Sequence, residues 1–223
     1  MTGTPDIAPV ERSKREAQAW YDRIAGVYDR LVYPFERRAI RRCLDVAAVT
    51  PGETVLEIGS GTGHTLVELA TTVGETGQTV GIDIAPRMVG RADAKLAASP
   101  MATGEAHLGD ATALPYRDGT FDAVVMTFTL ELFPEAELTT VLAECRRVLT
   151  DDGRLVVLSL ADDGAMAQLY KRLHAWFPRA FDCRPLPLAT LLEEKGWAIV
   201  EHRAGTLGGI PYSIVEARPG ERF

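Results

Sequence analysis

Three glycines follow an apolar run in the stretch VLEIGSGTGHT. Gly59, Gly61 and Gly63 have the spacing G-x-G-x-G, whereas the dinucleotide fingerprint G-x-G-x-x-G would need a glycine where this chain has His64. Glycines between a strand and a helix allow the backbone to approach a nucleoside ligand closely. We therefore interpret the turn as a site for an amino-acid-bearing nucleoside, with Glu57 orienting its ammonium group. The alternative is a merely tight strand–helix turn.

Acidic residues follow the next two apolar stretches. Asp83 ends QTVGID, where doubly wound sheets place an acid that accepts hydrogen bonds from ribose hydroxyls, and the apolar Ile84 and Met88 come next as partners for an adenine ring. Asp110 is expected to accept from the exocyclic amine of adenine, with the Ala111 N–H directed to the ring; the alternative is an ordinary turn aspartate. Because parallel strands end at one edge of an open α/β sheet, these acids and the glycine turn predict one ligand site.

Strands and helices alternate along the part of the chain that carries these residues. The predicted strands are 53–59, 78–84, 105–111, 121–128 and 155–160, the last after a turn at DDGR. The predicted helices between them are 64–73, 86–99 and 134–149. A helix at 189–196 precedes two further strands, 197–205 and 209–219, which indicate an antiparallel pair at the sheet edge. This alternation predicts an α/β fold with a doubly wound, mostly parallel sheet.

Helical patterns precede the first strand and also follow the fifth. Pro34 is expected to interrupt the N-terminal pattern between two helices. The predicted organisation is a disordered N-terminus at 1–12, an N-terminal helical cap at 13–50, and a ligand-binding domain at 51–223 with a helical lid around 164–188.

Composition narrows the function classes. The 223 residues carry a net charge of −7, which argues against nucleic acid as the main partner, because phosphate binding depends on clustered Lys and Arg. Three scattered cysteines, with no C-x-x-C pair and no metal-ligand spacing, predict a reducing compartment and no metal site. There is neither a signal-peptide core nor a run of about 20 apolar residues, so we expect a cytoplasmic protein.

The ordered motifs resemble those of the class I S-adenosylmethionine-dependent methyltransferases. VLEIGSGTG resembles their first motif, GIDIAPRM their acidic second-strand motif, GDATALPYRDGTFDAVVMTFTLELFP the next two, and RRVLTDDGRLVVLSL their helix–turn–strand-five signature. YDRIAGVYDRLVYP, ahead of these motifs, is similar to the methyltransferases of ubiquinone and menaquinone biosynthesis (methyltransferase type 11) and to bacterial phospholipid N-methyltransferases, while the C-terminal part departs from both. The resemblance implies a Rossmann-like seven-stranded sheet in the order 3-2-1-4-5-7-6, with strand 7 antiparallel.

The resemblance also implies a cofactor, S-adenosyl-L-methionine, and its product S-adenosyl-L-homocysteine. The residues that match the family's cofactor-binding motifs are Glu57, Gly59, Ser60, Gly61, Asp83, Ile84, Met88, Asp110, Ala111 and Thr127. Tyr28 and Tyr21, on the N-terminal helix, are expected to fold over the methionine end of the cofactor. Their alternative role is to pack that helix on the core.

We predict an S-adenosylmethionine-dependent methyltransferase that acts on a small, apolar acceptor of quinone-like, phenolic or lipid character. Methyl transfer depends mainly on alignment and exclusion of water, and a general base is needed only if the acceptor arrives protonated. The candidate bases are Glu131, just after strand 121–128, and His174, on the predicted lid. Each also has a plainer interpretation, as a solvated loop acid and a packing histidine.

Two other functions remain open. One is a non-catalytic cofactor-binding module; the other, opposed by His64 and Glu57, is an NAD-dependent oxidoreductase. The expected partner is a small-molecule acceptor, with the chain a monomer or homodimer. A basic side of the second helix predicts peripheral contact with an anionic membrane, against the alternative of a solvated helix face. Its residues are Arg37, Arg38, Arg41 and Arg42.

Overall fold

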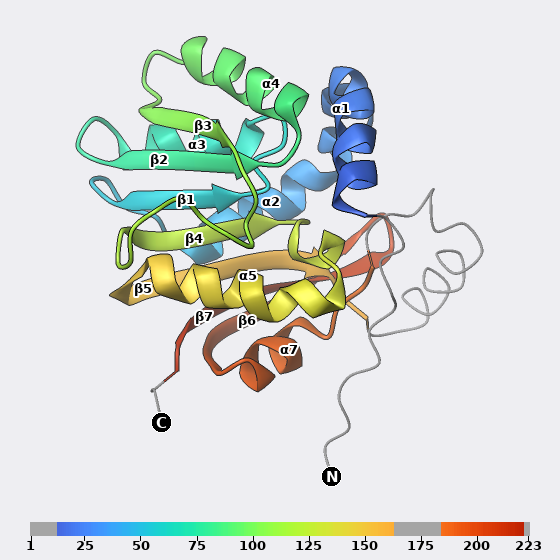
Figure 1. Cartoon of the computed structure of the whole chain (residues 1–223), viewed down its shortest axis with the longest axis vertical. Helices are drawn as coiled ribbons and strands as arrows, with labels where there is room; N and C mark the ends of the chain where they lie inside the picture. Colours follow the sequence, from blue (N-terminus) through green and yellow to red (C-terminus); the bar gives the residue numbers. More distant parts are fainter. Residues whose placement is uncertain (1–12, 163–183, 221–223) are drawn as a thin grey trace.

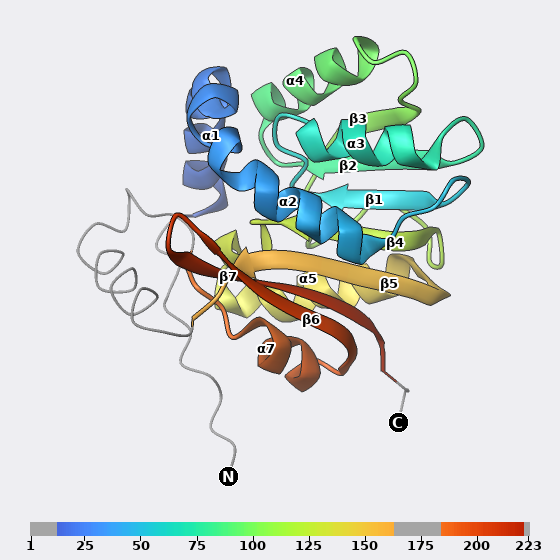
Figure 2. The ribbon, with the colours of Figure 1, turned by 180° about the vertical axis from the view of Figure 1, so that it is seen from behind.

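A seven-stranded sheet with helices on both faces forms the body of the molecule (Figures 1 and 2). The computed structural model describes residues 13–162 and 184–220. The strands are β1 (Thr54–Ile58), β2 (Gln78–Asp83), β3 (Gly104–Leu108), β4 (Phe121–Thr127), β5 (Leu149–Leu160), β6 (Trp197–Leu207) and β7 (Ile210–Pro219). Their order is β3-β2-β1-β4-β5-β7-β6, and β7 runs antiparallel to both of its neighbours. The predicted fold class and strand order are confirmed.

The helices cover both faces of the sheet, so the apolar core has two layers. Those described are α1 (Lys14–Leu31), α2 (Tyr33–Ala47), α3 (His64–Val73), α4 (Pro86–Ala97), the 3₁₀ turn η1 (Leu130–Leu132), α5 (Glu135–Val148) and α7 (Leu188–Glu194). Apolar residues of α5 and α7 pack on one face of the sheet, and those of α2 and α3 pack on the other. The central strands β1, β4 and β5 are buried on both faces, as expected for parallel strands covered by helices.

The cap is formed by two helices that are separated at Val32, close to the expected break; Pro34 itself lies in the first turn of α2, where its missing N–H costs no helical hydrogen bond. One local expectation was wrong. The DDGR segment lies inside β5 rather than in a turn before it. The pairing moves from Phe121–Leu149 directly to Ala123–Arg154, so the intervening residues of β5 bulge out of register.

The N-terminal cap is attached to the glycine turn by a polar cluster. Asp29 of α1 accepts hydrogen bonds from the Thr62 hydroxyl and from Lys95 of α4, the latter at 2.7 Å. His64 lies 3.2 Å from the same carboxylate and stacks on the Tyr33 ring at 3.7 Å between centroids. The residue that replaces a glycine of the dinucleotide fingerprint therefore anchors the cap.

Gly63, rather than the residue at position 64, allows α3 and α4 to pack closely. This residue has φ +85°, and a Cβ on it would lie 2.6 Å from the Cα of Ala92. A Cβ on Gly90, inside α4, would have nothing within 4 Å. The two glycines thus make a matched pair for testing backbone approach.

We expect Gly63→Ala to lower the free energy of unfolding by about 2–4 kcal/mol, because it combines left-handed backbone strain with a backbone clash. Gly90→Ala should raise it by about 0.5–1 kcal/mol, since only helix propensity changes. Denaturant unfolding of both variants measures the difference. Equal effects of the two substitutions would contradict the close approach of α3 and α4.

Candidate functional site

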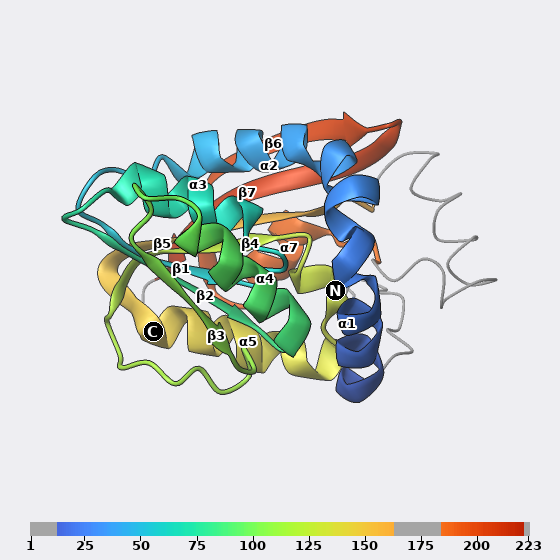
Figure 3. The same ribbon diagram turned by 90° about the horizontal axis from the view of Figure 1, so that it is seen from above.

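A cavity lies at the carboxyl ends of the central strands, with residues of α1 in its wall. Figure 3 shows α1 standing beside that edge of the sheet. Its wall includes ten of the twelve residues that the sequence predicted for the cofactor. They are Tyr21, Tyr28, Gly59, Gly61, Asp83, Ile84, Met88, Asp110, Ala111 and Thr127. The strands bring these residues together because β1, β2 and β4 run parallel and end at the same edge.

Asp83 holds the glycine turn. One carboxylate oxygen accepts the Gly61 N–H at 2.9 Å, and the other accepts the Ala85 N–H at 2.9 Å. Burial raises the pKa of Asp83, although these backbone N–H groups oppose the shift. Each carboxylate oxygen has more than one lone-pair position, so the side chain retains acceptor capacity on the cavity side.

Asp110 forms an ion pair with a residue of the N-terminal cap. Its carboxylate lies 2.7 Å from Nζ of Lys14 and accepts the N–H and hydroxyl of Thr112 at 2.9 and 2.8 Å. Burial would raise its pKa, but the Lys14 and Thr112 contacts outweigh burial and lower it. Lys14 also lies 3.1 Å from Glu137. Sequence analysis missed Lys14, which closes this end of the cavity from α1.

Glu57, in β1, and Ser60, within the glycine turn, are buried and are not on the cavity wall. Glu57 is 1% exposed, and one of its carboxyl oxygens has no hydrogen-bond partner among the described residues. Burial, and after it the charge of Asp83, raises the pKa of Glu57 well above its ordinary value. Burial therefore disfavours the charged form of this carboxyl group.

The two tyrosines of α1 serve the cavity and the core together. Tyr21 and Tyr28 line the cavity and also pack against the buried residues Ala85 and Met88. The Tyr28 hydroxyl donates to Glu36 of α2 at 3.0 Å. Burial raises the pKa of Glu36 to about 7, and sequence analysis gave this residue no role.

The two predicted bases differ from the cofactor residues in their placement. Glu131 is fully buried off the cavity wall and accepts the Leu160 N–H at 3.3 Å. Burial raises its pKa to about 8, so the carboxyl group is mostly protonated at neutral pH. His174 and most of the predicted lid lie outside the described residues. Arg184, just after them, is buried and donates to the Phe133 carbonyl.

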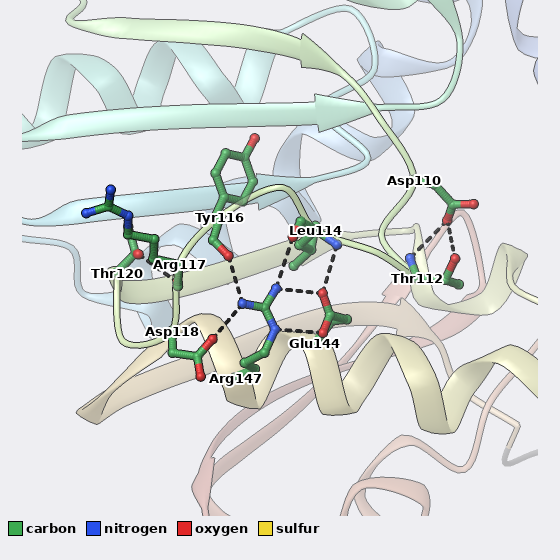
Figure 4. A network of polar contacts seen from close by, with 9 residues as sticks. All are labelled: Asp110, Thr112, Leu114, Tyr116, Arg117, Asp118, Thr120, Glu144 and Arg147. Carbon is green, nitrogen blue, oxygen red and sulfur yellow. Dashed lines mark hydrogen bonds and ion pairs between the residues drawn. The ribbon is translucent and has the colours of Figure 1, made fainter.

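A second arginine organises the loop that carries Asp110. The Arg147 guanidinium contacts Glu144 and Asp118 and donates to the carbonyls of Leu114 and Tyr116 (Figure 4). These contacts fix the segment between β3 and β4 from the end of α5. Arg147 stands in RRVL, which was recognised as part of a motif but was assigned no role.

The described residues hold neither a metal-binding cluster nor a membrane-spanning helix. Within 13–162 and 184–220, no group of three or more His, Cys, Asp or Glu side chains is placed to bind a metal. No helix in the same part of the chain has the length and apolarity to cross a membrane.

Known proteins share the motifs and the fold. A family model described as a methyltransferase domain matches residues 55–153. The chain is 38% identical over 135 residues to nocamycin O-methyltransferase of Saccharothrix syringae, covering 60% of this chain and 48% of that protein. It is 35% identical over 164 residues to a demethylmenaquinone methyltransferase of Tropheryma whipplei, covering 71% and 65%. The chain thus spans about half to two thirds of the length of these curated relatives.

Solved structures extend the likeness to nearly the whole fold. Magnesium protoporphyrin IX methyltransferase from Synechocystis PCC 6803, with bound SAH, gives a TM-score of 0.71 at 20% identity, covering 92% of this chain and 99% of that one. The [4+2]-cyclase SpnF gives 0.76 at 18% identity, covering 99% and 100%.

Fold and cavity together define a doubly wound α/β domain with its ligand site at the carboxyl edge of the sheet. Its ordered motifs and its relatives identify it further. Residues 55–153 match the methyltransferase-domain family, and the ordered motifs are those of the class I S-adenosylmethionine-dependent methyltransferases.

We expect Arg147→Lys to loosen the loop after Asp110, because an ammonium group cannot make the same four contacts. The free energy of unfolding should fall by about 1–3 kcal/mol. Hydrogen exchange should speed up in the loop, especially at the Leu114 amide, which donates to Glu144. Arg117→Lys, on the same loop, is the matched control. Unchanged loop protection in Arg147→Lys would contradict its positioning role.

Glu131 should make the fold less stable as pH rises. Its pKa is about 8 in the folded chain against an ordinary 4.5, so the native state binds more protons between these values. The free energy of unfolding therefore falls across this window, by at most about 1.4 kcal/mol per pH unit for one group. Glu131→Gln should flatten that decline in unfolding measured from pH 5 to about 8. An identical slope in both proteins would rule out a neutral Glu131.

Proposed function

We propose that the chain transfers a methyl group from S-adenosylmethionine to a small, apolar acceptor. The observation that carries the proposal is Asp83, held by the Gly61 and Ala85 N–H groups at the end of β2 and directed into the cavity. The family match and the motif order support the same cofactor. Two SAH-bound neighbours, the Synechocystis enzyme and NodS from Bradyrhizobium japonicum WM9, share the fold.

The cavity fits this cofactor on two observations of its own. A Cβ at Gly61 would meet nothing closer than 4.0 Å, so the backbone there is open to a ligand. Asp83 keeps lone pairs for the two ribose hydroxyls. We assign Ile84 and Met88 to the faces of the adenine ring, and Asp110 with Ala111 to its edge.

The structure qualifies three of these assignments. Lys14 already forms an ion pair with Asp110. The adenine amine would therefore share the Asp110 carboxylate with the Lys14 ammonium group or displace that group. Glu57 and Ser60 would act by supporting Gly59 and Gly61 rather than by contact. We assign Tyr21 and Tyr28 the role of covering the methionine end, where they also exclude water.

The chemistry asked of the protein is mainly positioning. When bound, the cofactor supplies a sulfonium methyl group that is already a strong electrophile. The chain's residues align the acceptor behind it and keep water away, which is worth roughly 7–11 kcal/mol of barrier in well-oriented reactions. Phe128, Leu132 and Phe133 give the cavity an apolar wall beside Thr127. For an acceptor that arrives protonated, Glu131 and His174 remain the predicted bases.

The acceptor class rests on these apolar residues and on the relatives. Curated relatives are named for nocamycin and for demethylmenaquinone, which are different acceptors. We therefore propose quinone-like, phenolic or lipid acceptors as the set to test. The likeness to a cyclase shows that this fold also carries other chemistry, so turnover must be measured as well as binding.

Calorimetric titration with S-adenosylhomocysteine tests the cofactor site. We expect binding to the wild type and at least about a hundredfold loss in Asp83→Ala, because two charge-assisted hydrogen bonds to ribose are removed. Asp93→Ala, an exposed acid of α4, should bind like the wild type. NAD⁺ and NADH are titrated in parallel, and binding of these alone would overturn the proposal.

Methyl transfer from the labelled cofactor to the acceptor set then separates an enzyme from a binding module. Product formation lost in Asp83→Ala supports the methyltransferase. Tight S-adenosylhomocysteine binding with no product from any acceptor of the three classes would favour the non-catalytic module instead.

A further inference from the structure

An exposed apolar stripe crosses the junction of α1 and α2. Val27, Leu31 and Phe35 are 47%, 62% and 70% exposed, and they recur every four residues. Helical hydrogen bonds continue through the junction, from the Val32 N–H to the Tyr28 carbonyl and from the Glu36 N–H to the Val32 carbonyl. The three side chains therefore lie close to the bend where the end of α1 meets the start of α2. They are half of the large apolar side chains that the described residues expose.

The stripe lies among cations in a chain whose net charge is −7. Residues 23–42 contain six arginines and two acids. Neither acid is exposed: Asp29 is bound by Lys95 and Thr62, and Glu36 accepts from Tyr28. Every exposed charged residue in this part of the described α1 and α2 is therefore an arginine.

The arginines do not all serve the stripe. Arg42 donates to the Tyr212 hydroxyl at 2.8 Å, Arg41 lines a hollow with Glu68 and Leu69 of α3, and the charge of Arg37 acts on Tyr33. Arg23, Arg30 and Arg38 are exposed on the same two helices as the apolar residues. We call Arg23, Val27, Arg30, Leu31, Phe35 and Arg38 the cap surface.

The cap surface is a different face of α1 from the one that lines the cavity. Lys14, Ala17, Tyr21 and Tyr28 are directed inward. Figures 1 and 3 show α1 standing outside the carboxyl edge of the sheet, next to α2. A layer that contacts the cap surface would thus lie beside the ligand cavity.

We propose that the cap surface binds bilayers rich in anionic phospholipid. Exposed apolar side chains enter the boundary between headgroups and acyl chains, while arginines reach the phosphates and lay their stems along the apolar region. The charge of the surface is opposite to that of the lipid and to that of the chain as a whole. The proposal goes beyond methyl transfer and needs no cofactor, but it would bring the cavity next to acceptors dissolved in the membrane.

Vesicle sedimentation tests the surface with the whole chain and no cofactor. The probes are vesicles of phosphatidylcholine alone and of phosphatidylcholine with phosphatidylglycerol in equal parts. We expect binding only to the anionic vesicles, weakening as salt is raised. Arg30→Glu with Arg38→Glu should lower the partition coefficient at least about tenfold. Leu31→Ser with Phe35→Ser should lower it as well, at unchanged charge.

Matched changes elsewhere provide the control. Arg117→Glu with Met101→Ser alters one exposed cation and one exposed apolar residue on other elements, and should bind vesicles like the wild type. Failure of the wild type to bind anionic vesicles at low salt would overturn the proposal, as would an equal loss in the control. So would a self-association that Phe35→Ser abolishes in sedimentation velocity without vesicle binding. Titration of the same variants with S-adenosylhomocysteine tells failure of this surface apart from failure of the cofactor site.

Discussion

The hydrogen bond from the Gly61 N–H to the Asp83 carboxylate ties the end of β1 to the end of β2. The site depends on this link, because it joins the glycine turn directly to the proposed ribose acceptor. The next residue along the turn, Thr62, donates to Asp29 of the cap, and Lys95 bridges the Thr62 carbonyl to the same aspartate. The position of α1 is thus set from the turn outward, so that loosening the turn would displace the wall of the cavity.

The sequence predicted those parts of the site that depend on local motifs. Gly61, Asp83 and Asp110 follow strands whose apolar patterns are clear, and parallel strands place such residues at one edge. Lys14 could not be found in this way, because its contact with Asp110 spans 96 positions and lies on a helix with no local signal for it. Arg147 was visible in a motif, but its role comes from a loop some 30 positions away.

The error in the fold has the same origin. The bulge at the start of β5 is a feature of its pairing with β4, and a sequence rich in Asp and Gly suggests a turn there for sound local reasons. His64 broke the expected dinucleotide spacing without loosening the packing, because Gly63 takes the close contact with α4 and His64 is free to stack on Tyr33. Tertiary contacts overrode the local pattern at the bulge, and at His64 they gave a structural role to the residue that breaks the dinucleotide spacing.

One part of the cavity wall is ionic and another part is apolar. Lys14, Asp110 and Glu137 form an ionic group at one end, while Phe128 and Phe133 give the wall near Thr127 its apolar character. Two buried acids lie behind the cavity wall: Glu36, which accepts from the cavity-lining Tyr28, and Glu131, which follows β4; burial raises the pKa values of both. A sulfonium group placed beside them would favour their ionised forms and lower those values, since an opposite charge stabilises a carboxylate. Loss of that positive charge on methyl transfer would remove the effect and leave burial to set both pKa values.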